Sequence, residues 1–262
     1  MTLHNCGGKT QAGTGKEMLQ KYANPKRFLK LANAFLPYVT GATFILIGAG
    51  VYYAFAASPP DYQQGQTVRI MYVHVPSAWM AMFTYAFIVV SSAVGLIWKH
   101  PIAHISALAA APIGACFTLV CLTTGSLWGK PMWGTWWVWD ARLTSVLVLL
   151  FLYLGFIALA NAFDDAARGE RASAILALIG GINLPIIKFS VDWWNTLHQP
   201  ASVTKIGMPS VHSSMLIPLV LMAVGFTTLF FTLLIIRMRS ELASRRINSH
   251  RAARIHAEAA TE

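Results

Sequence analysis

Charge is scarce in this chain of 262 residues: only 11% are Asp, Glu, Lys or Arg, whereas 56% are apolar. The mean hydropathy is +0.54. A soluble domain carries more charge than this, so the composition places the chain among proteins that cross a membrane several times. The formal net charge of +10 could suit nucleic acid, but the placement of the basic residues, described below, argues against that partner.

Cysteine is rare as well, and its three positions exclude a disulfide framework. Cys6 lies in the polar N-terminal segment, while Cys116 and Cys121 lie five residues apart in one apolar run. No CxxC motif occurs, so thiol–disulfide exchange is not expected. GxSxG and HExxH motifs are also missing, and GGKT at 7–10 lacks the earlier glycine of a phosphate-binding loop. We therefore expect no enzyme.

Long apolar segments are abundant. Each holds about 20 residues or more, which at ~1.5 Å per residue covers ~30 Å of hydrocarbon. Backbone polar groups in lipid must be satisfied within the segment, so helices are expected. The sequence therefore predicts an all-α integral membrane protein with six transmembrane helices, and Pro185 and Pro218 should kink the last two helices or mark their ends. The predicted spans are 36–57, 75–98, 105–126, 143–163, 172–191 and 215–237.

The basic residues predict the orientation. Most of the twenty Lys and Arg residues lie in the two tails and in the loops at 98–104 and 164–171, and the opposite loops hold only Arg69, Lys130, Arg142 and Lys205. Both termini should therefore be cytoplasmic, with the tails facing anionic lipid or partner proteins rather than nucleic acid. The expected parts are a basic N-terminal tail (1–35), a transmembrane domain (36–237) and a basic C-terminal tail (238–262). No signal peptide is expected, since the first thirty residues lack an apolar run.

The segment 128–144, WGKPMWGTWWVWDARLT, is the most unusual stretch. It lies between two apolar spans and should form a loop or a short surface helix on the non-cytoplasmic face. One or two tryptophans would be ordinary membrane-interface anchors, but five of them with an Asp-x-Arg pair indicate more. A wall of indoles suits a flat, apolar, aromatic ligand with charged edges, which describes heme. The residues are Trp128, Trp133, Trp136, Trp137, Trp139, Asp140 and Arg142.

Two histidines lie in other loops of the same face. His74 follows the first such loop in RIMYVHVP, and His198 lies in the third in DWWNTLHQP. A lone histidine at a membrane edge is usually a hydrogen-bonded surface side chain. A pair of them could instead bind heme iron from both sides, since neutral imidazole is a strong iron ligand. His212 shares this face, so topology alone leaves it as a further candidate.

Two arginines on this face could pair with the propionates of heme. Arg69 precedes His74, and Arg142 closes the tryptophan-rich segment. The guanidinium fork suits a carboxylate. The alternative is that each arginine only snorkels or forms an ion pair with Asp61 or Asp140.

These motifs resemble the heme exporter protein C family, also called cytochrome c maturation protein C, which belongs to a heme-handling superfamily defined by a tryptophan-rich WWD segment. The resemblance rests on WGTWWVWDARLTS, RIMYVHVP, NLPIIKFSVDWWNTLHQ and the AFDD turn, and it is densest over residues 59–199. His212 lies outside the matching motifs. The absence of CxxCH fits a protein that serves c-type cytochromes without being one.

The resemblance implies a site, a cargo and partners. Heme b would be held at the periplasmic surface of the bacterial inner membrane between axial ligands His74 and His198. The five tryptophans and Asp140 would form the platform, and Arg69 and Arg142 would lie near the propionates. The protein would pass heme to a periplasmic heme chaperone and would work with an ABC-type ATPase, a second membrane subunit and a small single-helix subunit.

Two other functions fit parts of the pattern. A b-type cytochrome subunit that takes electrons from quinol would usually bury its histidine pairs within the spans, whereas His74 and His198 lie at one edge. A passive scaffold would use the tryptophans only as anchors. Whether heme crosses the bilayer through this chain or arrives laterally is left open by the sequence.

Overall fold

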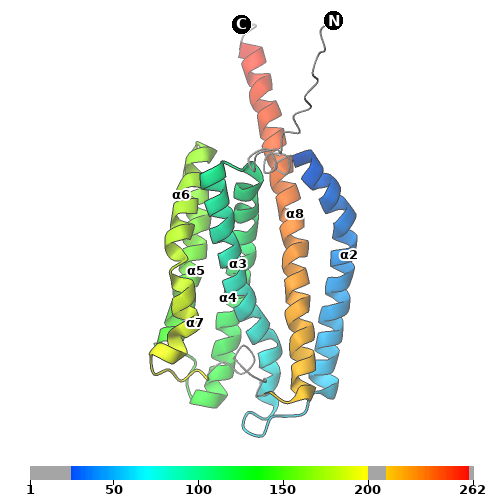
Figure 1. The fold of residues 1–262 in the computed structure, drawn as a ribbon, viewed down its shortest axis with the longest axis vertical. Coiled ribbons are helices and arrows are strands. Elements are labelled where there is room, and N and C mark those ends of the chain that lie inside the picture. Colours follow the sequence, from blue (N-terminus) through cyan, green and yellow to red (C-terminus); the bar gives the residue numbers. More distant parts are fainter. Residues whose placement is uncertain (1–24, 200–210, 260–262) are drawn as a thin grey trace, which may run out of the picture.

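The computed structural model describes residues 25–199 and 211–259 (Figure 1). This part of the chain is helical, and six of its helical stretches are long and apolar enough to cross a membrane, which confirms the predicted all-α architecture. The elements are α2 (Pro25–Tyr52), a π-helical turn η1 (Tyr53–Ala57), a 3-10 helix η2 (Gln66–Ile70), α3 (Met71–Trp98), α4 (Pro101–Trp133), α5 (Ala141–Ala160), α6 (Ala166–Gly180), α7 (Asn183–Trp193) and α8 (Ser213–Ala259).

The six crossings give the bundle two different ends (Figure 1). The start of α2 and the end of α8 lie at one end, which we call the terminal end. The connections at 58–65, 134–140 and 194–199 lie at the opposite end, which we call the tryptophan-rich end. All of the predicted site residues therefore belong to one end of the molecule.

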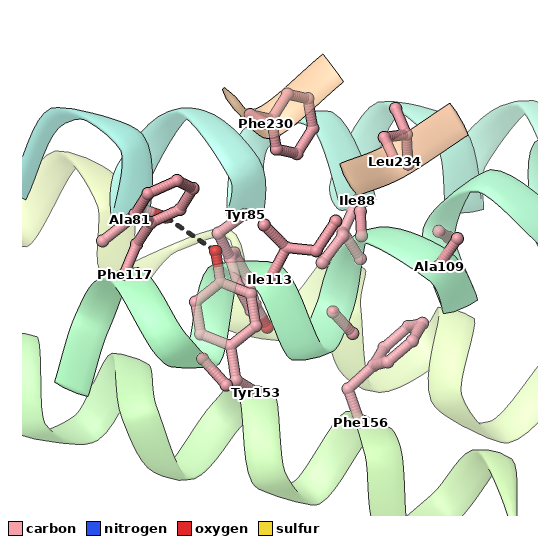
Figure 2. Close-up of a cluster of buried hydrophobic side chains, with 14 of the residues drawn as sticks. Ala81, Tyr85, Ile88, Ala109, Ile113, Phe117, Tyr153, Phe156, Phe230 and Leu234 are labelled. Carbon is pink, nitrogen blue, oxygen red and sulfur yellow. Dashed lines mark hydrogen bonds between the residues drawn. The ribbon is translucent and has the colours of Figure 1, made fainter. Parts of the chain in front are cut away.

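The core forms around α4, whose small residues let neighbouring helices approach closely. Figure 2 shows side chains from α3, α4, α5 and α8 meeting in this core. Tyr153 of α5 lies over Gly114, where an added Cβ would overlap the phenol ring. Its hydroxyl donates to the carbonyl oxygen of Ala81 on α3 at 2.7 Å. This contact fixes α5 against the α3–α4 pair. The buried small residues of α4 are Ala103, Ser106, Ala107, Ala109, Ala110, Ala111, Gly114, Ala115, Thr118, Cys121 and Gly129.

The fifth span is broken, and proline explains where. α6 ends at Gly180 and α7 begins at Asn183. Pro185 has no N–H to donate to the carbonyl oxygen of Gly181, and the N–H of Leu184 donates to that oxygen instead, at 3.1 Å. The span is therefore interrupted next to Pro185, as expected for a proline that kinks a span or marks a helix end. Pro218, by contrast, lies near the start of α8 without interrupting it.

Several helices are longer than the apolar spans that predicted them. α3 begins at Met71, with Pro76 inside it, so His74 lies on a helix rather than in the loop before one. α4 continues to Trp133, so only 134–140 of the tryptophan-rich segment is non-helical. The expectation of a loop or short surface helix over 128–144 was wrong for its first third, because an apolar count underestimates helices that extend beyond the hydrocarbon.

Candidate functional site

His74 is held by α4. Its Nδ1 lies 3.1 Å from the carbonyl oxygen of Cys121 and 3.1 Å from Oγ1 of Thr124. A carbonyl oxygen can only accept, so Nδ1 carries the hydrogen. In a neutral imidazole the lone pair is then on Nε2, the state in which a histidine can bind a metal.

His198 also has its Nδ1 bonded to a carbonyl oxygen, but this carbonyl belongs to its own segment and not to another helix. It lies in the segment 194–199 after α7, and its Nδ1 is 2.9 Å from the carbonyl oxygen of Gln199. Its backbone N–H donates to Oγ1 of Thr196 at 3.1 Å. Burial lowers the pKa of the His198 imidazole; the bond to Gln199 opposes this shift, Arg142 adds to it and Asp140 opposes it. The net effect favours the neutral ring, again with the lone pair on Nε2.

The structure places the two imidazoles within electrostatic reach of each other. His74 and His198 lie close enough to interact electrostatically, and His198 also interacts with Arg142 and Asp140. His212 is in a different state. The N–H of Ser214 donates to its Nδ1 at 3.3 Å, just before α8 begins, so Nδ1 is an acceptor and the neutral ring carries its hydrogen on Nε2. The geometry therefore favours His198 over His212 as the partner of His74.

The first tryptophans of the segment pack on the end of α4. Trp128 and Trp133 meet edge to face, with ring centroids 5.2 Å apart. Trp133 covers Gly129, where a Cβ would lie 3.2 Å from the indole. Gly134 then ends the helix with φ 77°, a conformation that suits glycine. Gly129 thus leaves room for the Trp133 ring, and Gly134 allows the sharp turn that follows. Together they keep Trp128 and Trp133 packed at the helix end.

The remaining tryptophans are on the turn between α4 and α5. Trp139 is 76% exposed and Trp136 is 54% exposed, with the Lys130 ammonium 5.9 Å from the Trp136 ring centroid. Trp137 and Trp139 meet edge to face at 5.5 Å. The Nε1 of Trp137 is buried with no hydrogen-bond partner among the described residues. Large apolar rings and an unused donor are therefore both present at this end.

Asp140 has two roles at the start of α5. Its Oδ1 accepts from the N–H of Leu143 at 2.8 Å and so caps the helix. Its Oδ2 is buried and has no hydrogen-bond partner within the described residues, although the Arg142 guanidinium interacts with this carboxylate electrostatically. One oxygen is structural, and the other is available to a ligand.

Arg142 connects α5 to α7. Its Nε donates to Oγ of Ser190 at 3.1 Å, and its Nη2 lies 3.3 Å from the carbonyl oxygens of Ile187 and Lys188. These carbonyls lie in the middle of α7, and the carbonyl oxygen of Ile187 also accepts from Oγ of Ser190 at 2.8 Å. The guanidinium thus fixes the helix that leads to His198.

Arg69 lies on η2 with its guanidinium carbon 5.4 Å from the centroid of the Phe55 ring. Its Nε is buried and has no hydrogen-bond partner among the described residues. Asp61, one of the alternatives for an ion pair, accepts locally from the N–H groups of Gln63 and Gln64. Arg69 therefore offers a donor to a ligand, as the sequence suggested, but the described interactions do not place it against the two histidines.

Three contributors were not predicted. Cys121 and Thr124 hold His74, although both looked like ordinary residues of the span 105–126. Gln64 accepts from the indole N–H of Trp128 at 2.9 Å and so ties the first loop to the tryptophan-rich segment. No local pattern marks any of them, because each acts through a contact with a segment distant in the sequence.

The fold and these residues define a class: a six-span helical membrane protein with histidines, arginines and exposed indoles gathered at one end. Comparison with known proteins identifies the family within that class. A family model described as heme exporter protein C matches residues 18–253, and the chain belongs to that family.

The similarity to known relatives extends over most of this chain and most of each relative. The chain is 57% identical over 227 residues to a heme exporter protein C of Bradyrhizobium diazoefficiens, spanning 87% of this chain and 86% of the relative. It is 49% identical over 222 residues to heme exporter protein C of Escherichia coli K12, spanning 85% and 89%. A putative cytochrome c biosynthesis ccmC-like mitochondrial protein of Marchantia polymorpha is 50% identical over 196 residues, spanning 74% and 83%.

Proposed function

We propose that this protein binds heme b at the tryptophan-rich end and delivers it to a periplasmic heme chaperone during cytochrome c maturation. His74 and His198 are the proposed axial ligands. The observation that carries the proposal is the matched state of these imidazoles: each is bonded through Nδ1 to a carbonyl, and the two rings lie near each other. The name heme exporter protein C, borne by the relatives, supports heme as the cargo.

The other groups at this end fit heme as well. The exposed rings of Trp136 and Trp139 offer flat apolar surfaces to a porphyrin, alongside Trp128, Trp133 and Trp137. Propionates need cations, and Arg69 has a buried donor without a partner. Arg142 would contribute its charge from a fixed place, since two of its nitrogens are already bonded. Asp140 contributes an unbonded carboxylate oxygen to the same surroundings.

The same proposal assigns an orientation and partners. The tryptophan-rich end faces the periplasm of a bacterial inner membrane, where a heme chaperone can reach it, and the basic terminal end faces the cytoplasm. ATP hydrolysis is assigned to an ABC-type ATPase, with a second membrane subunit and a small single-helix subunit in the complex. This chain is then the heme-binding delivery subunit rather than an enzyme.

The test is an absorption spectrum of the purified protein, co-expressed with its heme chaperone. His74→Ala and His198→Ala should each weaken or shift the Soret band and reduce the covalent heme on the chaperone, because each removes one axial ligand. His212→Ala is the matched control and should resemble the wild type. Normal maturation of c-type cytochromes in the double variant lacking both His74 and His198 would contradict the proposal.

A further inference from the structure

Three residues on two adjacent turns of α4 contact the His74 ring. Besides the two hydrogen bonds from Nδ1, Gly125 lies beside the ring, and an added Cβ there would be 3.0 Å from Cε1. Cys121 contacts the imidazole only through its backbone carbonyl oxygen, and Gly125 leaves room for the ring because it has no side chain. Thr124 is therefore the one of these three residues whose side chain bonds the imidazole.

The Thr124 hydroxyl can act only as an acceptor toward His74. It has a single hydrogen, and its Oγ1 lies 2.6 Å from the carbonyl oxygen of Val120, the usual threonine bond to the preceding helical turn. A carbonyl cannot donate, so that hydrogen is used there. The oxygen then accepts the Nδ1–H that it shares with the Cys121 carbonyl.

We infer that Thr124 is a positioning residue for His74: its hydroxyl holds the Nδ1–H tautomer and the rotation of the ring that leave Nε2 available to iron. The inference rests on the proposed heme-binding function. A carbonyl alone accepts from many ring orientations, whereas two acceptors restrict the ring. Partners of this kind behind a metal-binding histidine raise its basicity and fix its orientation.

The neighbouring residue Thr123 provides a matched control. Its hydroxyl makes the same bond to the preceding turn, to the carbonyl oxygen of Leu119 at 2.7 Å, but it is exposed. Thr124→Val and Thr123→Val therefore make the same chemical change one residue apart. Only the first removes an acceptor from His74.

The experiment titrates the purified full chain with hemin and records the affinity and the absorption spectrum. Thr124→Val should weaken heme binding about ten-fold, the usual loss when such a partner is removed, and should reduce the six-coordinate low-spin fraction. Thr124→Ser keeps the hydroxyl and should restore both, and Thr123→Val should match the wild type. Gly125→Ala gives a second route if the valine variant folds poorly, because its methyl displaces the ring while the hydroxyl stays.

His74→Ala, titrated in parallel, separates the two possible failures. If His74→Ala loses heme but Thr124→Val and Gly125→Ala both keep wild-type affinity and spectrum, the inference about Thr124 is overturned and the proposed site stands. If His74→Ala itself binds heme as the wild type does, the proposed ligand is wrong and the inference falls with it.

Discussion

The two histidines are held in contrasting ways. His74 is on α3 and is bonded to Cys121 and Thr124 of α4, so the packing of two long helices sets its position. His198 is bonded to Gln199, its neighbour along the chain, and to Thr196 in the same short segment. Helix packing in a core opens only with large free-energy changes, whereas short connecting segments open easily. One proposed ligand is thus set by the fold, and the other depends on a local conformation.

The His198 side gains stability from Arg142 instead. This guanidinium bonds Ile187 and Ser190 of α7, a few residues before the segment that carries His198. Its bonds do not touch the imidazole, so they restrict where the segment begins but not how the ring points. In the proposed heme site, His74 is therefore held rigidly by the fold, whereas His198 lies in a segment that can adapt to the ligand.

The largest expected loss of stability comes from removing the Arg142 guanidinium, which bonds α5 to α7. Arg142→Met should cost about 2–3 kcal/mol of stability, because it leaves the acceptors of α7 without a charged donor. It should also weaken heme binding by more than the Thr124→Val change, and the remaining heme should show His74 as its sole protein ligand. Thermal unfolding and hemin titration measure the two effects.

Arg142→Lys is the control for that change. It keeps the charge but not the planar fork, so it should recover only part of the stability. Full stability and heme affinity in Arg142→Met would show that α7 needs no anchor and would remove the contrast between the two sides.

On the His198 side, replacement of Asp140 should lower the stability by less than replacement of Arg142. Asp140→Ala removes the cap of α5 and should lower the free energy of unfolding by about 1 kcal/mol. Asp140→Asn keeps a good capping group and should be close to the wild type in stability, so any loss of heme in that variant reports the carboxylate charge alone. Equal stability of the alanine and asparagine variants would exclude a capping role.

The smallest effect is expected on the His74 side, where Trp128 bonds Gln64. Trp128→Phe keeps the aromatic contact but loses one neutral hydrogen bond, which should cost about 0.5–1 kcal/mol. Gln64→Leu removes the same bond from the other partner, and the double variant should be little worse than either single one. Strict additivity in this cycle would mean that the bond contributes nothing to joining the loop to α4.

The sequence alone predicted those features that depend on local composition. Apolar length identified the six spans, and Pro185 marked the break in the fifth. The tryptophans, Asp140 and the two histidines stood out because so many of them lie in the loops of one face, where one or two tryptophans alone would be ordinary anchors. Their identity as a heme site is still a proposal.

The contacts of His74 could not be predicted, for a physical reason. Which side of α4 faces α3 is set by packing, and α4 is small and apolar on several sides, with Ala107, Ala109, Ala110 and Ala111 all buried. Such a helix has no polar face to show its rotation. The placement of Cys121 and Thr124 against His74 therefore emerges only when the helices are assembled.

The length of α8 has a mechanical consequence. Its 47 residues form one uninterrupted helix, about 70 Å long at ~1.5 Å per residue, roughly twice what ~30 Å of hydrocarbon requires. Figure 1 shows it standing out from the terminal end. Arg245 pins it to α6 through Glu170, with nitrogen and oxygen 2.6 Å apart, and Thr232 meets Thr43 of α2 farther along. Because α8 is one continuous helix, its end beyond Arg245 is held in a fixed direction relative to the bundle.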